Sequence, residues 1–333
     1  NTKLYSGTGS SNAVTGVGFQ PDWTWIKKRN GTNYHVATDA VRLATKQIYP
    51  NSTGPEETVA EGLKSFDSDG FTLGTNGDTN GSGGNYVGWN WKANGAGSAN
   101  TDGDINSTVS VSQTAGFSIV KYTSGGGGQT VGHGLGAVPK MMIAKRLGGN
   151  GYDWVVYHQN DTAGLYLNGN GKDYDGSSSN IWFNGSAPTS SVFTCGSDGR
   201  MTGSGVDFIV YCFAEIKGYS KFGNYKGNGN ANGTFIYTGF KPAFVLLKDG
   251  TSIASWLIYD NKRDVDNVAS HRLYTNATDA EDSDTSSAID LLSNGFKCRT
   301  SDNSTNKSGA GFIYMAFAEN PIVGSNKTPA TAR

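Results

Sequence analysis

The segment GFQPDWTWIK at residues 18–27 is the most informative for predicting the fold, because two later segments of the chain repeat its pattern. Residues 136–145 read GAVPKMMIAK, and residues 239–248 read GFKPAFVLLK. Each segment has a glycine, a proline three residues later, and then a mostly apolar run that ends in a lysine. A short apolar run bounded by turn residues is typical of a β-strand. The chain therefore contains three copies of one strand-forming motif.

Two further landmarks recur in the same order. A polar residue two positions before a phenylalanine recurs at residues 69–71, 191–193 and 294–296, and an aromatic-rich run recurs at residues 86–91, 208–213 and 312–317. The three motif prolines are separated by 118 and 103 residues, and the ends of the aromatic runs by 122 and 104 residues. Landmarks that recur with matching spacing indicate tandem units.

The same short apolar runs, separated by Gly, Asn, Asp and Ser, cover most of the chain. They predict an all-β fold of three homologous β-sandwich-like units in tandem, with a jelly-roll or lectin-like form as the alternative. The predicted ranges are 1–93 for unit one, 94–115 for a flexible Gly/Ser/Asn-rich linker, 116–217 for unit two, 218–323 for unit three and 324–333 for a C-terminal tail. Only the windows 39–48 and 279–292 suggest short helices.

The composition excludes two classes of partner. Lys and Arg number 27 and Asp and Glu number 28, so the formal net charge is −1. A chain this close to neutral lacks the positive field that attracts nucleic acid or an anionic membrane. It also lacks a run of about 20 apolar residues, the length that a transmembrane helix requires. We expect neither nucleic-acid binding nor membrane insertion.

The residues predict no catalytic site. The three cysteines do not have the spacing of a zinc or redox motif, and the four histidines lie outside nucleophile-elbow and metalloprotease motifs. Glu215 and Glu319 end equivalent strands in units two and three, which favours a structural salt bridge over a catalytic acid. We expect the protein not to be an enzyme.

Two acid–base pairs recur after equivalent strands. Asp39 precedes Arg42 by three residues in unit one, and Asp260 precedes Arg263 by three residues in unit three. Oppositely charged side chains at this spacing can reach each other across a turn. We interpret both pairs as structural.

Four aspartates are candidates for calcium binding. Asp67 and Asp69 are one residue apart and adjoin a glycine, as do Asp102 and Asp104. Clustered carboxylates are the ligands that Ca²⁺ prefers, although neither cluster completes an EF-hand loop. Calcium is the only cofactor that these residues suggest, and metal-free Asx turns are the alternative.

Three tyrosines are candidates for surface recognition. Tyr34, Tyr152 and Tyr174 lie in turn-like segments rich in Gly, Asn or Asp. Rigid aromatic side chains on loops often contact glycans or proteins, so we predict glycan contact at these positions. The alternative is that each ring covers the edge of a core.

The order of the motifs resembles one known family across essentially the whole chain. The matching segments are residues 18–27, SFDSDGF 65–71, WNWKA 89–93, VGHGLG 131–136, DFIVYCFAE 207–215, SKFGNYKGNG 220–229, FIYMAFAENP 312–321 and PATAR 329–333. They resemble the repeated β-domains of fibre-like virion structural proteins of marine tailed phages, of the cyanophage type.

The resemblance implies a virion protein without catalytic residues. It implies a tail or head fibre, or another surface appendage, with a role in host attachment. It also implies assembly in the host cytoplasm into an extracellular particle, as a homo-oligomer with a trimer favoured. The expected partners are other virion proteins and a host surface glycan or protein. Three alternatives stay open: a carbohydrate-binding adhesin module, a subunit of an extracellular filament or capsid decoration, and a glycan depolymerase.

Overall fold

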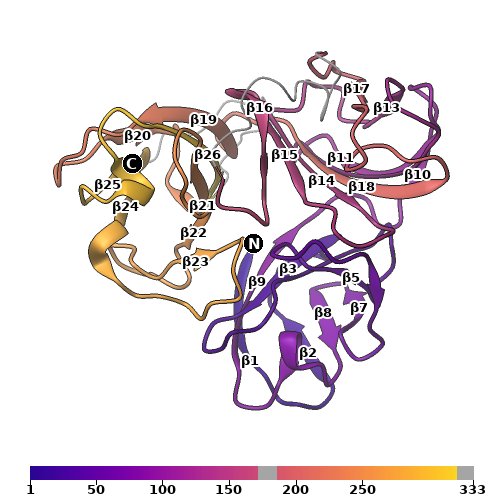
Figure 1. The fold of residues 1–333 in the computed structure, drawn as a ribbon. Coiled ribbons are helices and arrows are strands. Elements are labelled where there is room, and N and C mark those ends of the chain that lie inside the picture. The colour runs from indigo at the N-terminus through magenta and orange to yellow at the C-terminus, as the bar shows by residue number, and fades with distance from the viewer. Residues whose placement is uncertain (172–185, 321–333) are drawn as a thin grey trace.

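Each sequence unit folds into two antiparallel β-sheets that enclose apolar side chains, as the computed structural model shows (Figure 1). The structure describes residues 1–171 and 186–320. Within these ranges the helical elements are short, namely α1 (Gly77–Asn80), α2 (Asn303–Asn306) and the 3-10 turn η1 (Thr285–Ser287). The prediction of an all-β fold with sandwich-like units is confirmed.

The larger sheet of each unit is built around the repeated strands. In unit one the order is β1 (Thr2–Ser6), β9 (Asn85–Trp91), β3 (Trp23–Lys28), β4 (Val36–Asp39), β5 (Lys46–Ile48) and β6 (Glu57–Thr58). In unit two it is β10 (Ser98–Asn100), β11 (Ser107–Ser112), β12 (Phe117–Ser124), β18 (Val206–Phe213), β14 (Met141–Arg146), β15 (Val155–His158) and β16 (Asp161–Tyr166). In unit three it is β19 (Ser220–Lys226), β26 (Gly311–Ala318), β21 (Pro242–Asp249), β22 (Leu257–Asp260) and β23 (Leu273–Tyr274).

The pairing register is the same in all three large sheets. The motif strands β3, β14 and β21 each pair with the aromatic-rich strand that closes the unit. Trp23 faces Trp91, Met141 faces Phe213, and Phe244 faces Phe317. The motifs that were aligned by sequence are therefore equivalent in space.

The smaller sheets contain the other recurrent landmark. Their strands are β2 (Asn12–Thr15), β8 (Gly70–Leu73) and β7 (Leu63–Asp67) in unit one, β13 (Thr130–Gly132) and β17 (Val192–Thr194) in unit two, and β20 (Phe235–Tyr237), β25 (Gly295–Cys298) and β24 (Ile289–Leu292) in unit three. Phe71, Phe193 and Phe296 are buried in the core of their own sandwich. The recurrent phenylalanine thus joins the two sheets of each unit.

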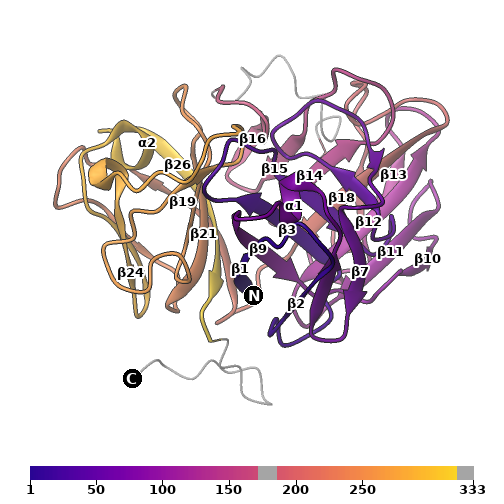
Figure 2. The same cartoon turned by 90° about the horizontal axis from the view of Figure 1, so that it is seen from below.

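A second core lies where the three large sheets meet. Trp23, Trp91, Phe213 and Phe317 belong to one buried cluster that takes side chains from all three units. The ring centroids of Trp23 and Tyr211 are 4.3 Å apart, although the residues come from different units. Figures 1 and 2 show the three units arranged around this common centre. Because both faces of the large sheets are covered, their strands are apolar at successive positions.

The segment predicted as a flexible linker, residues 94–115, is part of the unit-two sheet. Its strands β10 and β11 pair with each other, and β11 pairs with β12 along six residues. Gly97 illustrates why glycine was misleading there: it has a φ of +79°, and a Cβ atom would lie 2.7 Å from the backbone of Val109. The glycine permits close packing of two chain segments and does not supply flexibility.

The two windows predicted to be helical are also different in the structure. Residues 39–48 form a turn followed by β5, and residues 279–292 contain only η1 before β24. Within residues 1–171 and 186–320, no helix has the length and apolar character needed to cross a membrane.

Candidate functional site

The two Asp–Arg pairs form buried salt bridges, as the sequence predicted. Nε of Arg42 lies 2.6 Å from Oδ2 of Asp39, and Nε of Arg263 lies 2.6 Å from Oδ2 of Asp260. The other carboxylate oxygen of each aspartate accepts a hydrogen bond from the backbone N–H of its arginine. Each aspartate therefore holds the turn that follows its strand.

Each of these turns also contacts the next unit around the common centre. Oδ2 of Asp39 accepts a hydrogen bond from Oη of Tyr211 at 2.7 Å, and Oδ2 of Asp260 accepts one from Nε1 of Trp89 at 3.0 Å. In unit two the equivalent residue is His158, whose Nε2 lies 3.2 Å from the Tyr314 carbonyl of unit three. The contacts run from unit one to two, from two to three, and from three back to one.

A ring of tryptophan contacts runs around the molecule in the opposite sense. Nε1 of Trp154 in unit two donates to the Tyr49 carbonyl of unit one, and Nε1 of Trp256 in unit three donates to the Tyr166 carbonyl of unit two. The equivalent residue in unit one is His35. The pKa of His35 lies well below its ordinary value because the ring is buried. A hydrogen bond with the backbone of Tyr274 in unit three opposes this shift but does not outweigh it.

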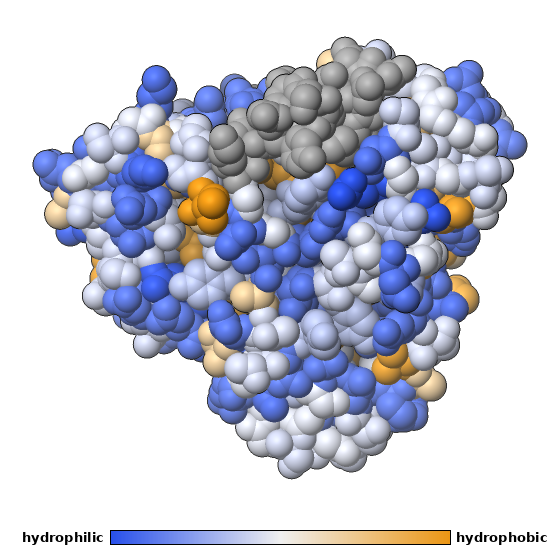
Figure 3. Space-filling model, viewed as in Figure 1, coloured by the Kyte–Doolittle hydropathy of each residue, from blue (hydrophilic) through white to orange (hydrophobic). Residues whose placement is uncertain are grey.

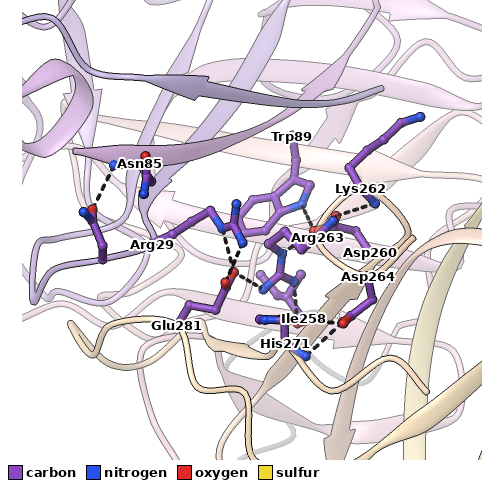
Figure 4. Close-up of polar contacts among 11 residues, drawn as sticks. Arg29, Asn85, Trp89, Ile258, Asp260, Lys262, Arg263, Asp264, His271 and Glu281 are labelled. Carbon is purple, nitrogen blue, oxygen red and sulfur yellow. Dashed lines mark hydrogen bonds and ion pairs between the residues drawn. The ribbon is translucent and has the colours of Figure 1, made fainter. Parts of the chain in front are cut away.

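The seam between units three and one contains an ion network that joins the two units (Figure 4). Glu281 bridges two arginines, because Oε1 lies 2.6 Å from Nη2 of Arg29 and Oε2 lies 3.1 Å from Nη1 of Arg263. Burial raises the pKa of Glu281, but the two guanidinium groups outweigh burial and lower the pKa overall. Since Arg29 belongs to unit one, this network joins the two units directly.

A pocket of about 440 Å³ lies in the same seam. We call it the seam pocket. Its aromatic lining includes Phe19, Trp91, Tyr219, Phe244 and Phe317, and its polar lining includes Lys92, Asn261, Lys262 and Glu319. Ligand sites commonly have volumes of about 300–1,000 Å³ and combine an apolar lining with a few placed polar groups. The seam pocket has both properties.

Asn261 lines the seam pocket and has an unpartnered acceptor among the described residues. Its side chain is 8% exposed, and its Nδ2 donates to Oε1 of Glu319 at 2.7 Å. A carboxylate only accepts hydrogen bonds, so the amide nitrogen must face Glu319 and the amide oxygen must point elsewhere. That oxygen, Oδ1, is buried without a hydrogen-bond partner among the described residues.

Chain connections cross two of the three seams. Residues 92–97 lead from β9 to β10 and so join units one and two, while residues 214–219 lead from β18 to β19 and join units two and three. Within the described residues, no segment joins β26 of unit three to β1 of unit one. Figure 1 places the first residues of the chain at the centre, beside this seam.

Comparison with known proteins identifies the family of the chain. A family described as a domain of unknown function, DUF7483, matches residues 1–321. The chain belongs to this family. The match covers all three units as one DUF7483 domain, which agrees with the core that they share. No curated protein and no solved structure matches the chain.

Two of the predicted recognition tyrosines of this DUF7483 domain, Tyr34 and Tyr152, each lie beside another side chain of their own unit. Tyr34 is 46% exposed, and its ring lies 5.1 Å from that of Tyr49 in the same unit. Tyr152 is half-buried beneath Arg146, whose guanidinium carbon lies 4.0 Å from the ring centroid. Tyr174 lies outside the described residues. Glycan contact by these tyrosines stays a prediction.

The four aspartates predicted to bind calcium all accept hydrogen bonds from other residues of the chain. Asp69 accepts from the backbone N–H groups of Gly16 and Gly18, and these bonds lower its pKa. Asp67 accepts from Ser65 and Thr72, Asp102 from Asn100, and Asp104 from Thr130. Within residues 1–171 and 186–320, no three His, Cys, Asp or Glu side chains are grouped to hold a metal ion. Calcium binding stays a prediction.

The interpretation of Glu215 and Glu319 as structural ion pairs is confirmed. Oε1 of Glu215 lies 2.8 Å from Nζ of Lys221, and Oε2 of Glu319 lies 2.9 Å from Nζ of Lys241. Sequence reasoning missed that Glu319 also lines the seam pocket and orients Asn261. A pocket between units has no signature along the chain, because its residues come from distant segments.

The lysine that ends each motif strand has a structural role that was also missed. Lys27, Lys145 and Lys248 are completely buried. Nζ of Lys27 donates to three backbone carbonyl groups, including that of Thr278 in unit three. Burial lowers the pKa of Lys27 and of Lys145 to about 8. Recurrence of the lysine in all three motifs was the signal that could have revealed this role.

Proposed function

We propose that the chain is a non-enzymatic structural protein of a tailed-phage particle. In this role it forms part of a tail or head fibre, or a similar surface appendage, and contributes to host attachment. The observation that carries the proposal is the common core, in which aromatic side chains of three units pack together. Such a core packs the three repeats into one rigid body, which suits an appendage that must resist deformation.

The use of the buried charges supports a structural role. Asp39, Asp260 and Glu281 are paired with arginines, and each of these networks also reaches a residue of another unit. Catalytic acids and bases are instead typically placed in a cleft with a pKa tuned to proton transfer. The ionisable groups of the seams stabilise the contacts between units.

The surface suits a component of a particle that is exposed to water. Figure 3 shows a face on which hydrophilic residues predominate and hydrophobic residues occur in small separate groups. Large exposed apolar patches mark interaction sites or aggregation hazards. The proposed partners are further copies of the chain, with a trimer favoured, other virion proteins, and a glycan or protein of the host surface.

The test is to locate the chain in purified particles. Phage particles from a lysate are banded by density, examined by mass spectrometry for peptides of the chain, and labelled with a gold-coupled antibody against it. We expect peptides in the particle band and gold on a projecting appendage. Recovery of the chain only from the particle-free fraction would contradict the proposal. Gold along a continuous filament or over the capsid would favour the filament or decoration alternative.

A second measurement addresses attachment and catalysis together. Purified chain is added to host cells before the phage, and adsorption is counted. We expect the chain to reduce adsorption without releasing new reducing ends from host polysaccharide. Release of reducing ends would instead favour the glycan depolymerase.

A further inference from the structure

We propose that the seam pocket binds one acidic sugar residue, such as the uronate unit of an acidic polysaccharide. The inference deepens the attachment role proposed above, and it rests on that role only for the origin of the polysaccharide. Three features of the pocket carry it: an orphan acceptor, an excess of positive charge, and an aromatic lining.

The orphan acceptor has no donor among the described residues. Within residues 1–171 and 186–320, Oδ1 of Asn261 is buried without a hydrogen-bond partner, and a buried polar atom in this state is destabilising until it is hydrogen-bonded. Asn261 is held in place at two points, because its backbone N–H donates to the Ala243 carbonyl at 3.0 Å and its Nδ2 donates to Glu319. A hydroxyl group of a sugar is a donor of the required kind.

The equivalent positions in the other two seams have no such acceptor. The register places Asp39, His158 and Asp260 at the same position, so that Ala40 and Gln159 are equivalent to Asn261. Ala40 has no polar side-chain atom, and Nε2 of Gln159 donates to the Phe222 carbonyl at 2.7 Å. The acceptor is therefore specific to the seam that contains the pocket.

The free charges of the pocket favour an anion. Lys92 and Lys262 line the pocket, and both are exposed and form no salt bridge within the described residues. The negative charge of Glu319 is offset by Lys241 at 2.9 Å. Backbone N–H of Lys262 donates to Asp260, and Figure 4 shows the lysine side chain extending away from the ion network. An ammonium group in this position can form a charge-assisted hydrogen bond with a carboxylate.

The aromatic lining suits the apolar face of a sugar ring. Phe19 and Tyr219 are half-buried and line the pocket, while the nearly buried rings of Trp91 and Phe317 lie deeper. Aromatic side chains combine a large apolar area with low conformational entropy, which is why ligand sites use them. Hydroxyl groups, a carboxylate and an apolar face occur together in a uronate.

The test is calorimetric titration of the purified chain with trigalacturonate and with the neutral counterpart galactotriose. We expect trigalacturonate to bind at least about tenfold more tightly, a difference of about 1.4 kcal/mol, and its affinity to fall as salt is added. Equal affinity for the two sugars would overturn the assignment of an acidic ligand. Failure of both to bind would overturn the site.

Matched variants locate the binding. Lys262→Met should weaken trigalacturonate about tenfold and leave galactotriose unchanged, while Lys64→Met, which removes a lysine outside the pocket lining, should change neither. Asn261→Ala should weaken both sugars about tenfold, whereas Gln159→Ala at the equivalent position should weaken neither. Circular dichroism and the thermal midpoint establish that each variant is folded. Binding that survives both pocket variants would place the sugar elsewhere and overturn the inference.

The outcomes separate the two proposals. Absence of the chain from phage particles would contradict the proposed function, yet trigalacturonate would still bind the purified chain. Presence of the chain on particles without uronate binding would overturn only the inference about the pocket.

Discussion

At the scale of single residues, the buried carboxylate of Asp260 accepts hydrogen bonds from residues of two units. One oxygen accepts from the backbone N–H groups of Lys262 and Arg263. The other accepts from Nε of Arg263 and from Nε1 of Trp89 in unit one. A buried charge with all of its hydrogen-bonding capacity satisfied is tolerated, whereas removal of one partner leaves an uncompensated charge.

We therefore expect Arg263→Met to destabilise the protein by about 3–5 kcal/mol. Both side chains of the Arg263–Asp260 pair are completely buried, so the orphaned carboxylate cannot recover its hydration. The control is Arg299→Met: the Arg299 side chain is 47% exposed beside Asp290, and its loss should cost less than about 1 kcal/mol. Urea denaturation of the three proteins gives the comparison. Similar losses for the two variants would contradict the role assigned to the buried pair.

His158 makes the stability depend on pH. Burial lowers its pKa from an ordinary value of 6.5 to about 4. The folded protein therefore keeps this ring neutral, while the unfolded chain takes up a proton as the pH falls below 6.5. The stabilisation is complete above about pH 6.5, and roughly 3 kcal/mol of it is lost as the pH falls toward 4.

The measurement is the urea midpoint at pH 7 and at pH 4.5 for the protein and for His158→Gln. We expect the variant to lose less stability between the two pH values, because glutamine takes up no proton. An identical loss in both proteins would show that other groups cause the pH dependence.

At the scale of elements, β11 is a strand in a segment that was wrongly predicted to be a flexible linker. Its sequence STVSVS at residues 107–112 alternates polar and apolar side chains, which is a strand signal. The surrounding Gly, Ser and Asn favoured the interpretation as a linker. In the structure Val109 is buried opposite Val120 of β12, so the strand extends the unit-two sheet.

Hydrogen exchange distinguishes a strand from a linker in this segment. We expect peptides that cover residues 107–112 to exchange slowly, at rates close to those of peptides from β12, because the two strands are paired along six residues. Mass spectrometry of the deuterated, digested protein gives these rates. Exchange at the rate of an unfolded chain would restore the linker interpretation.

At the scale of the whole molecule, the common core makes the three units interdependent. Trp23, Trp89 and Trp91 of unit one are at most 6% exposed, and they pack against side chains of units two and three. Removal of those units would expose a large apolar surface on unit one. Tandem repeats in the sequence therefore do not mean independent domains.

We expect a protein that consists of residues 1–93 to aggregate or to lack fixed tertiary packing, whereas the full chain unfolds in one cooperative calorimetric transition. Size-exclusion chromatography and near-ultraviolet circular dichroism test the fragment, with the full chain prepared in the same way as the reference. A monomeric fragment with a native-like aromatic spectrum would show that unit one folds alone.

The local sequence was sufficient to predict the repeated strands, the three repeats and the turn-holding pairs Asp39–Arg42 and Asp260–Arg263. Strand-forming runs, turn residues and pairs three residues apart are properties of neighbours along the chain, so they can be read without a fold. The same reasoning predicted ion pairs for Glu215 and Glu319. It could not say which contacts those residues make beyond their own unit.

Only the tertiary structure reveals how the units pack together and where a pocket lies between them. The partners of Asp260 and Asn261, namely Trp89 and Glu319, are 171 and 58 residues away along the chain. Oδ1 of Asn261 is left without a partner among the described residues because Glu319 accepts from the amide nitrogen and so fixes the direction of the amide oxygen. Such features depend on the packing of distant segments, and a single sequence contains no local pattern that encodes them.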